Sequence, residues 1–381
     1  MVKIKLFFVL VVFSIALPGD IVIAQEKKEK EEKEENVFLH PDKFYRKFFP
    51  HLRIRRNPPD SQYIRLYQNF LSVGVHVLSP VIRIGIDSKK SIPPGIDPSL
   101  KLRTNISDIV GFSVGYRFVS AGFAYLLKSG LNTHNDYAAS HYRTATIKYS
   151  GSAFSFQFKY VRIKGFTDVN TFNRIDLYQK YRQRPDMLSK DFQFEGIYNL
   201  SWKKYSYIAP LTFAQRQIKS HAGFLLKAGI YYNQLSGDSA LIGHKQQIYY
   251  DDFNGVKIIR SLSLRLAPGV GGNLVFYKQF YMSLAAFTSF DFYNYKYLKA
   301  ADEKVHARQT AVFLLDGKAS LGYQSRRLFM GLRYEAERRI GSLHHIQTNT
   351  IYSYTGIELG YRFNAPHIIK KIYKKTMPPG M

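Results

Sequence analysis

The sequence predicts an all-β chain that closes into an antiparallel transmembrane β-barrel of about 12 strands, with about 14 as the alternative. Three observations support this fold class. Apolar and polar side chains alternate with a period of two, the alternating segments are long, and the connections between them are either very short or long and polar. Strands of ordinary globular domains average about 5 or 6 residues, whereas a tilted membrane-spanning strand needs about 9 to 11.

The start of the chain predicts export. Lys3 and Lys5 precede a short apolar run over 6–17, and small residues lead to a predicted cleavage near Ala24, so we interpret residues 1–24 as a signal peptide. A buried N-terminal helix or an uncleaved anchor is the alternative. Residues 25–60 are predicted to be a periplasmic segment that contains a solvated linker of mixed charge at 26–36. The chain has no cysteine, so an exported domain of this size must rely on burial and hydrogen bonds.

The barrel is predicted over residues 61–364. Its strands are expected at 62–87, 111–118, 121–127, 141–150, 153–163, 191–202, 222–234, 261–276, 280–298, 310–324, 328–339 and 347–363. Tight turns are expected at 150–152, 203–204, 278–279 and 325–327, and long loops at 127–141, 165–190 and 298–309. Short turns at one end and long loops at the other are typical of outer-membrane barrels. Two further strands, at 205–217 and within 244–259, would raise the count to the alternative.

One face of the predicted strands is apolar and the other is charged. The apolar face collects, for example, Phe154, Phe156, Phe192, Phe194, Phe224, Leu226, Phe313, Leu315, Met330, Leu332, Ile357 and Leu359. Four aromatic residues are expected at the membrane interfaces, namely Trp202, Tyr205, Tyr361 and Phe363. A soluble sandwich with the same residues in its core is the alternative.

The charged face balances six cations against six anions. They are Lys159, Glu195, Lys227, Asp291, Asp316, Lys318, Arg333, Glu335, Glu337, Arg339, Glu358 and Arg362. We expect a charge network in the lumen that includes Arg333, Glu335, Glu337, Arg339, Asp316, Lys318 and Glu195. Because buried charges are costly unless they are paired, this balance predicts a closed or narrow lumen crossed by ion pairs. The net charge of +27 must then come from loops, turns and the C-terminal tail.

Catalytic and metal-binding motifs are sparse. Asp251 and Asp252 lie in one predicted connection, and His344 and His345 lie in another. A carboxylate and a histidine can activate water or a serine, but polar loop residues of these types are more often solvated. There is no phosphate-binding glycine loop and no zinc signature, so we expect no enzyme, no cofactor and no metal. The basic charge invites a nucleic-acid partner, but no groove-reading helix or RNA-binding module accompanies it.

Several stretches resemble a known family. They are "PDKFY" at Pro41, "VGYRF" at Val114, Arg184-Pro185-Asp186, the alternating strand from Phe192, and Gly229-Ile230-Tyr231-Tyr232. With these features the chain resembles domain of unknown function 4421, a Bacteroidota family of predicted outer-membrane barrels. The resemblance implies a barrel fold and an outer-membrane location, and it implies no catalytic residues.

The last predicted strand resembles the C-terminal signal read by the barrel-assembly machinery, through Tyr354, Gly356, Leu359 and Tyr361. The chain then continues as a basic tail over 365–381. Its apolar residues, which stand beside four lysines, could form a short periplasmic helix or a surface-lying segment, and a disordered tail is the alternative. These residues are Ile368, Ile369, Ile372 and Tyr373.

We therefore expect an outer-membrane protein that is channel-like or structural and that passes small solutes or lipids. A membrane-embedded hydrolase acting on lipid or peptide is the first alternative, and a docking or adhesin barrel that works through the loop at 165–190 is the second. We do not expect an energised transporter, because 25–61 is too short for a plug domain. The expected partners are outer-membrane lipid and lipopolysaccharide, which Lys203, Lys204, Arg326 and Arg327 would face.

Overall fold

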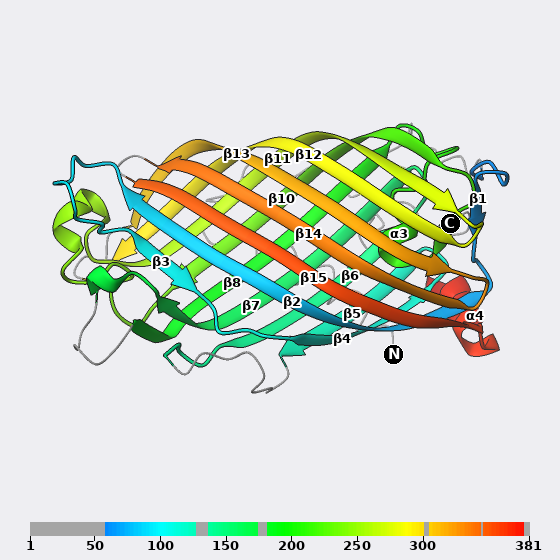
Figure 1. The fold of residues 1–381 in the computed structure, drawn as a ribbon, viewed down its shortest axis with the longest axis horizontal. Helices are drawn as coiled ribbons and strands as arrows, with labels where there is room; N and C mark the ends of the chain where they lie inside the picture. Colours follow the sequence, from blue (N-terminus) through cyan, green and yellow to red (C-terminus); the bar gives the residue numbers. More distant parts are fainter. Residues whose placement is uncertain (1–57, 127–135, 174–180, 301–304, 344–345, 377–381) are drawn as a thin grey trace, which may run out of the picture. The chain divides into compact units, whose positions relative to one another are not determined.

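Alternation along the chain produces strands that pair antiparallel with their neighbours and close on themselves. The computed structural model describes residues 58–126, 136–173, 181–300, 305–343 and 346–376. Twelve strands of this part form the barrel (Figure 1). They are β2 (Phe70–Ser88), β4 (Ile109–Tyr116), β5 (Val119–Leu126), β6 (His141–Ser150), β7 (Phe154–Asp168), β8 (Arg182–Asn199), β10 (His221–Ser236), β11 (Val256–Phe276), β12 (Phe280–Lys299), β13 (Val305–Gln324), β14 (Leu328–Leu343) and β15 (Ile346–Asn364).

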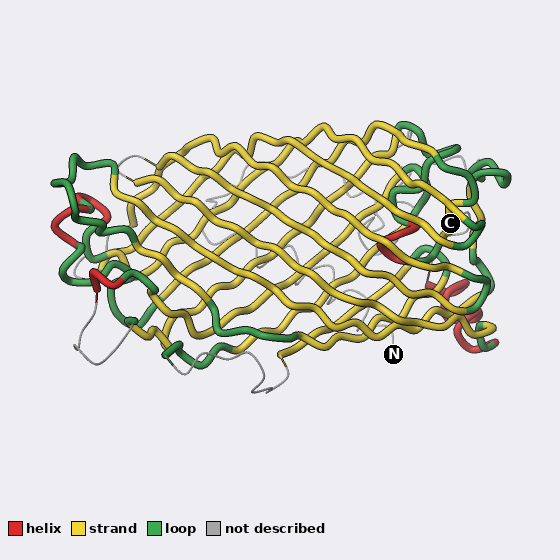
Figure 2. The backbone as a smooth tube through the Cα atoms, viewed as in Figure 1, coloured by secondary structure: helices red, strands yellow, loops and turns green. Residues whose placement is uncertain are grey.

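The barrel closes where its last strand meets its first. β15 pairs with β2 along its whole length, from Ile346 opposite Ser88 to Asn364 opposite Phe70. Figure 1 shows these two strands side by side, and Figure 2 shows the tilted strands of the wall. This closure pairs the first and last edges of the sheet with each other, as a membrane-spanning sheet requires. The predicted fold class and the count of twelve are confirmed.

The alternative of two additional strands is wrong. Residues 205–217 contain a short helix, α3 (Ala209–Thr212), and the three-residue strand β9 (Gln215–Gln217), which pairs with β1 (Ile64–Leu66). Residues 244–259 contain two 3-10 turns, η3 (Gln247–Tyr249) and η4 (Asp251–Phe253), before β11 begins. Both segments bury apolar side chains inside the barrel or at its mouth, so their hydropathy resembles that of strands.

A short strand completes the wall where three others end early. β4, β5 and β6 stop short, and β3 (Leu100–Arg103) bridges β2 and β7 beyond them. The junction is held by Ser140, whose hydroxyl donates to the Gly165 carbonyl at 2.8 Å and accepts from the Asn105 N–H at 2.9 Å. Gly165 has a φ of 87°, and a Cβ at this position would overlap the Ala139 carbonyl oxygen, so the junction requires glycine here.

The wall strands have a buried inner face and an exposed apolar outer face, as expected for strands that contact membrane hydrocarbon. Along β12 the inward side chains are buried, namely Tyr281, Ser283, Ala285, Phe287, Ser289 and Asp291. The alternating residues point outward, and Leu284 and Phe292 remain 64% and 66% exposed. A soluble domain rarely leaves so continuous an apolar surface in water. No helix among the described residues is long and apolar enough to cross a membrane.

The two ends of the barrel are built differently. At the end that we call the turn end, short connections join β4 to β5, β6 to β7, β11 to β12 and β13 to β14. Tyr277 and Lys278 both have positive φ, which matches the twist of a tight hairpin. At the opposite loop end, residues 237–255 pack on the mouth, and we call them the loop-end cap. Its Leu241, Tyr250 and Phe253 join an apolar cluster with inward side chains of β2, β7 and β12.

Polar contacts hold the loop-end cap in place. The Tyr250 hydroxyl donates to the Ile86 carbonyl at 2.6 Å and accepts from the Leu100 N–H at 3.2 Å. The buried Arg184 donates to the Ala240 carbonyl at 2.8 Å and pairs with Asp186 at 2.8 Å. The lumen therefore ends in a packed apolar layer on this side.

The chain divides into two units, residues 58–366 and residues 1–57 with 367–381. In the second unit the structure describes α4 (His367–Thr376), whose Ile368 and Ile372 are exposed. The tail thus contains a short helix, which is one of the forms expected from its sequence.

Candidate functional site: the barrel lumen

A folded-in segment closes the turn end of the lumen. The connection 200–220 between β8 and β10 turns inward and carries α3, and we call it the plug. Its buried side chains include Tyr205, Tyr207, Ile208, Ala209 and Phe213. Tyr205 fits because Gly223 and Gly271 line the wall beside it, and a Cβ on Gly271 would overlap its hydroxyl oxygen. Burial raises the pKa of Tyr205 above its ordinary value, so the phenol stays neutral.

Side chains of five wall strands fasten the plug through its main-chain carbonyls. The Asn199 amide donates to the Tyr205 carbonyl at 2.7 Å, and the Asn273 amide donates to the Ser206 carbonyl at 2.8 Å. Gln324 donates to the Ala209 carbonyl at 2.7 Å. Arg333 donates to the Leu211 carbonyl at 3.1 Å, and Arg362 donates to the Phe213 carbonyl at 2.8 Å. A segment without a regular ladder leaves carbonyls unpaired, and these donors satisfy them.

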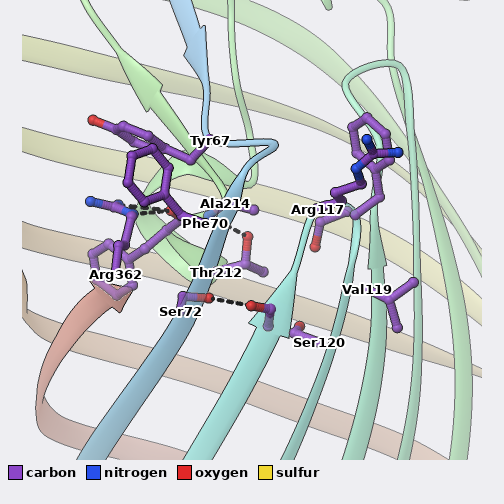
Figure 3. A pocket seen from close by; sticks show the side chains of 13 residues that line it. Tyr67, Phe70, Ser72, Arg117, Val119, Ser120, Thr212, Ala214 and Arg362 are labelled. Atoms are coloured by element: carbon purple, nitrogen blue, oxygen red, sulfur yellow. Dashed lines mark hydrogen bonds between the residues drawn. The ribbon is translucent and has the colours of Figure 1, made fainter. Parts of the chain in front are cut away.

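Arg362 anchors the last part of the plug. Its guanidinium lies 3.9 Å from the Tyr67 ring centre and 4.9 Å from the Phe329 ring centre, and Phe329 stacks on Phe213 at 4.4 Å. Figure 3 shows Arg362 close to Tyr67 at this pocket, which Thr212 of the plug also lines. The pocket has a volume of only about 10 Å³, so the turn end is packed.

A network of ion pairs crosses the middle of the lumen. The buried Arg265 makes two bonds of 2.8 Å to Asp291 and lies 3.5 Å from Glu337, which Arg339 contacts at 2.6 Å. The other pairs are Lys227 with Asp316, Lys318 with Glu335 at 3.5 Å, and Arg333 with Glu358 at 2.7 Å. Tyr231 donates a hydrogen bond to Glu195. The structure therefore places all seven residues of the expected network on the inner face, each bonded to another side chain of that face.

A cavity of about 150 Å³ lies beside this network, against the shorter strands β4, β5 and β6. Leu211 and Thr212 of the plug line one part of it, and Leu78, Ala124 and Tyr142 line another. The other polar side chains of the lining are Ser72, His76, Ser113, Ser120, Thr144, Thr146, Lys148, Gln157, Lys159, Arg333, Glu335, Tyr354 and Glu358.

The four aromatics expected at the interfaces do not share one environment. Tyr361 and Phe363 are 42% and 48% exposed on the outer face of β15, and Trp202 lies at the turn end with the Lys203 ammonium 5.8 Å from its ring centre. The expectation for Tyr205 is wrong, because this side chain is fully buried in the plug. The predicted tight turn at Lys203-Lys204 is the start of the longer connection that folds inward.

Several inward charges are absent from the set predicted from the sequence, and the buried Arg184 is one of them. Arg265, Lys148 and Asp191 lie on the inner face of β11, β6 and β8. The alternation alone could have found them. Arg265 stands between Leu264 and Leu266, which both point outward, and Lys148 stands two residues after Thr146, which points inward. Strand alternation therefore assigns both charges to the inner face.

Of the four catalytic candidates of the sequence, the structure describes only the side chain of Asp251. Asp251 forms an ion pair with Lys90 at the loop end. His344, His345, the signal peptide at 1–24 and the motif at Pro41 lie outside the described residues, and so does the side chain of Asp252. Within the described ranges, no group of three or more metal-ligating side chains could hold a metal ion.

Solved structures with some likeness to this chain are bacterial outer-membrane proteins. The outer-membrane protease OmpT from Escherichia coli shares 9% identity over 78% of this chain and 98% of its own, with a TM-score of 0.35. The translocator domain of the autotransporter NalP from Neisseria meningitidis shares 12% identity over 76% and 88%, with a TM-score of 0.37. An outer-membrane channel from Pseudomonas putida F1 shares 8% identity over 80% and 100%, with a TM-score of 0.32.

No curated protein matches the chain in sequence. The model of one protein family, described as a domain of unknown function (DUF4421), matches residues 58–363, the stretch that forms the barrel and its plug. This match confirms the resemblance to domain of unknown function 4421. The chain belongs to the DUF4421 family.

Proposed function

We propose that this chain is an outer-membrane barrel that acts as a closed passage for small polar solutes and opens when the plug moves. The apolar outer face supports a hydrocarbon environment for the wall. The charged and hydroxyl-rich inner face supports contact with polar solutes, because a small barrel that served only as an anchor could fill its interior with apolar side chains.

The plug is the observation that carries the proposal. It blocks the turn end, yet it contributes no strand to the wall and is fastened by five side-chain donors to its backbone. Five hydrogen bonds worth about 1 kcal/mol each favour the closed state by about 5 kcal/mol, and the buried side chains of the plug add to this, so fewer than about one molecule in several thousand is open. A bound solute or partner that favours the open state can shift an equilibrium of this size.

Conductance in planar bilayers tests the plug. We expect the native protein to show no sustained open current. The substitution Gly271→Ala places a methyl group against the Tyr205 hydroxyl and should displace the plug, so open steps should become frequent. Gly272→Ala is the matched control, because its new Cβ would lie 3.4 Å from the nearest atom, Cβ of Ala222.

Two results would contradict the proposal. The first is a native protein that conducts as a permanently open pore. The second is a correctly folded Gly271→Ala variant that stays as silent as the Gly272→Ala control.

We also infer contact with outer-membrane lipid and lipopolysaccharide, and delivery by the barrel-assembly machinery. Lys203, Lys204 and Arg326 are exposed at the turn end, which is the periplasmic end of an outer-membrane barrel, so the head groups that they can meet are those of anionic phospholipid. The last strand keeps Leu359 and Tyr361 on its outer face, in keeping with the expected assembly signal. Membrane fractionation checks the location, and recovery of the processed chain in the periplasm without detergent would count against it.

We propose no catalytic role. Support comes from the acidic side chains of the lumen network, each of which pairs with a cation or accepts a hydrogen bond. These carboxylates are the groups that a general acid or base would use, and they already have partners. The check is to assay lipase, protease and deacylase activity of the purified protein and of a variant with His344 and His345 replaced by alanine. Turnover that disappears in the variant would overturn this part of the proposal.

A further inference from the structure

We propose that the lumen cavity is a binding site for one small oxyanion, inorganic phosphate or a short carboxylate, held by Lys148 and Lys159. The inference deepens the proposed function and rests on it, since it names the class of solute that the passage receives.

The first support is the balance of charges around the cavity. Arg333 is matched by Glu358 at 2.7 Å, and Glu335 is matched by Lys318 at 3.5 Å. Lys148 and Lys159 are the other two lysine or arginine side chains of the cavity lining, and neither has a carboxylate within ion-pair distance in the described part of the chain. Lys159 instead has its ammonium 4.9 Å from the ring centre of Tyr354.

The second support is the closeness of the two lysines. On the paired strands β6 and β7, Lys148 lies opposite Gln157, and Thr146 lies opposite Lys159. The two lysines are therefore diagonal neighbours on the inner face, at a separation of about 7 to 8 Å that long side chains can span. Side chains of this length can bring both ammonium groups to one anion placed between them, and each would donate a charge-assisted hydrogen bond to it.

The third support is the supply of neutral donors around the lysines. Thr146 and Gln157 complete the square of side chains, and Ser120, opposite Lys148 on the paired strand β5, lines the same cavity. Hydroxyl and amide groups beside two ammonium groups form a donor set from which phosphate and carboxylate oxygens accept hydrogen bonds. The cavity of about 150 Å³ suits a small anion and is too small for a lipid or an oligosaccharide.

The test is calorimetric titration of the full chain in detergent micelles with inorganic phosphate, with succinate and with uncharged glycerol. We expect the native protein to bind at least one of the two anions at a single site and not to bind glycerol. Replacing both lysines, Lys148→Met with Lys159→Met, should weaken anion binding by at least about tenfold, because it removes two charge-assisted hydrogen bonds. Lys148→Arg should retain binding.

Lys164→Met is the matched control. Lys164 lies on the same strand as Lys159 but is exposed, so its loss should leave anion binding unchanged. Thermal unfolding provides a second readout, since a bound anion should raise the midpoint of the native protein and not that of the double variant.

Two results would overturn the site. One is a native protein that binds neither phosphate nor succinate at millimolar concentrations, and the other is a folded double variant that binds as the native protein does. Binding in detergent does not depend on passage through the barrel. A plug variant that stays silent while anion binding is intact would therefore defeat the proposed passage and leave the site standing.

Discussion

The pair of Arg265 and Asp291 allows a test of whether the middle of the lumen is dry and paired. Both side chains are fully buried and joined by two hydrogen bonds of 2.8 Å, and the Arg265 guanidinium lies 3.9 Å from the Tyr231 ring centre. Arg265→Met leaves a buried carboxylate without its partner, and Asp291→Leu leaves a buried guanidinium. Each single change should lower the free energy of unfolding by about 3–5 kcal/mol.

The double variant separates the pair from its parts. With Arg265→Met and Asp291→Leu together, both buried charges are gone and Glu337 keeps Arg339 at 2.6 Å, so the loss should be far smaller than the sum of the single losses. The expected coupling free energy is about 3 kcal/mol or more. Urea unfolding in lipid vesicles measures it, and the single tryptophan of the chain, Trp202, reports the transition by its fluorescence.

An exposed ion pair provides the value with which this coupling free energy is compared. Lys101 and Asp97 form an ion pair at the loop end with side chains 48% and 54% exposed, so the same cycle there should give a coupling of at most about 1 kcal/mol. If the Arg265 cycle gives a coupling as small as that of the surface pair, the lumen at this level is filled with water. The reasoning about a closed, paired interior would then fail.

Two further predictions concern the wall. Gly165→Ala should lower the free energy of unfolding by about 2–4 kcal/mol, because the position has a positive φ and the new Cβ would overlap the Ala139 carbonyl oxygen. Gly255→Ala, at a position with positive φ but open space around it, should lower it by about 1 kcal/mol. Equal losses in urea unfolding would contradict the role of Gly165 at the β3 junction. Leu284→Lys on the outer face of β12 should cost about 2–4 kcal/mol in a bilayer, while Tyr277→Lys at the turn end should cost little. A folded Leu284→Lys variant of native stability would mean that hydrocarbon does not contact this face.

The wall of the barrel could be predicted because a strand follows a local rule. A period of two assigns each side chain to a face from its neighbours alone, so the inward position of Arg333, Glu335 and Glu337 followed without knowledge of the fold, whereas the choice between 12 and 14 strands did not. The same rule extends to Arg265 and Lys148 once the alternation is continued along their strands.

The plug and the cavity follow no local rule. Residues 205–217 carry aromatic and apolar side chains that suit a strand, and they turn inward because side chains from distant strands, such as Gln324 and Arg362, satisfy their carbonyls. The sequence alone therefore determined the barrel and its two faces, because strand periodicity is a property of adjacent residues. Only the tertiary structure decided which segment fills the lumen, and which two lysines of the cavity have no carboxylate within ion-pair distance among the described residues. Both outcomes depend on contacts between residues far apart in the chain.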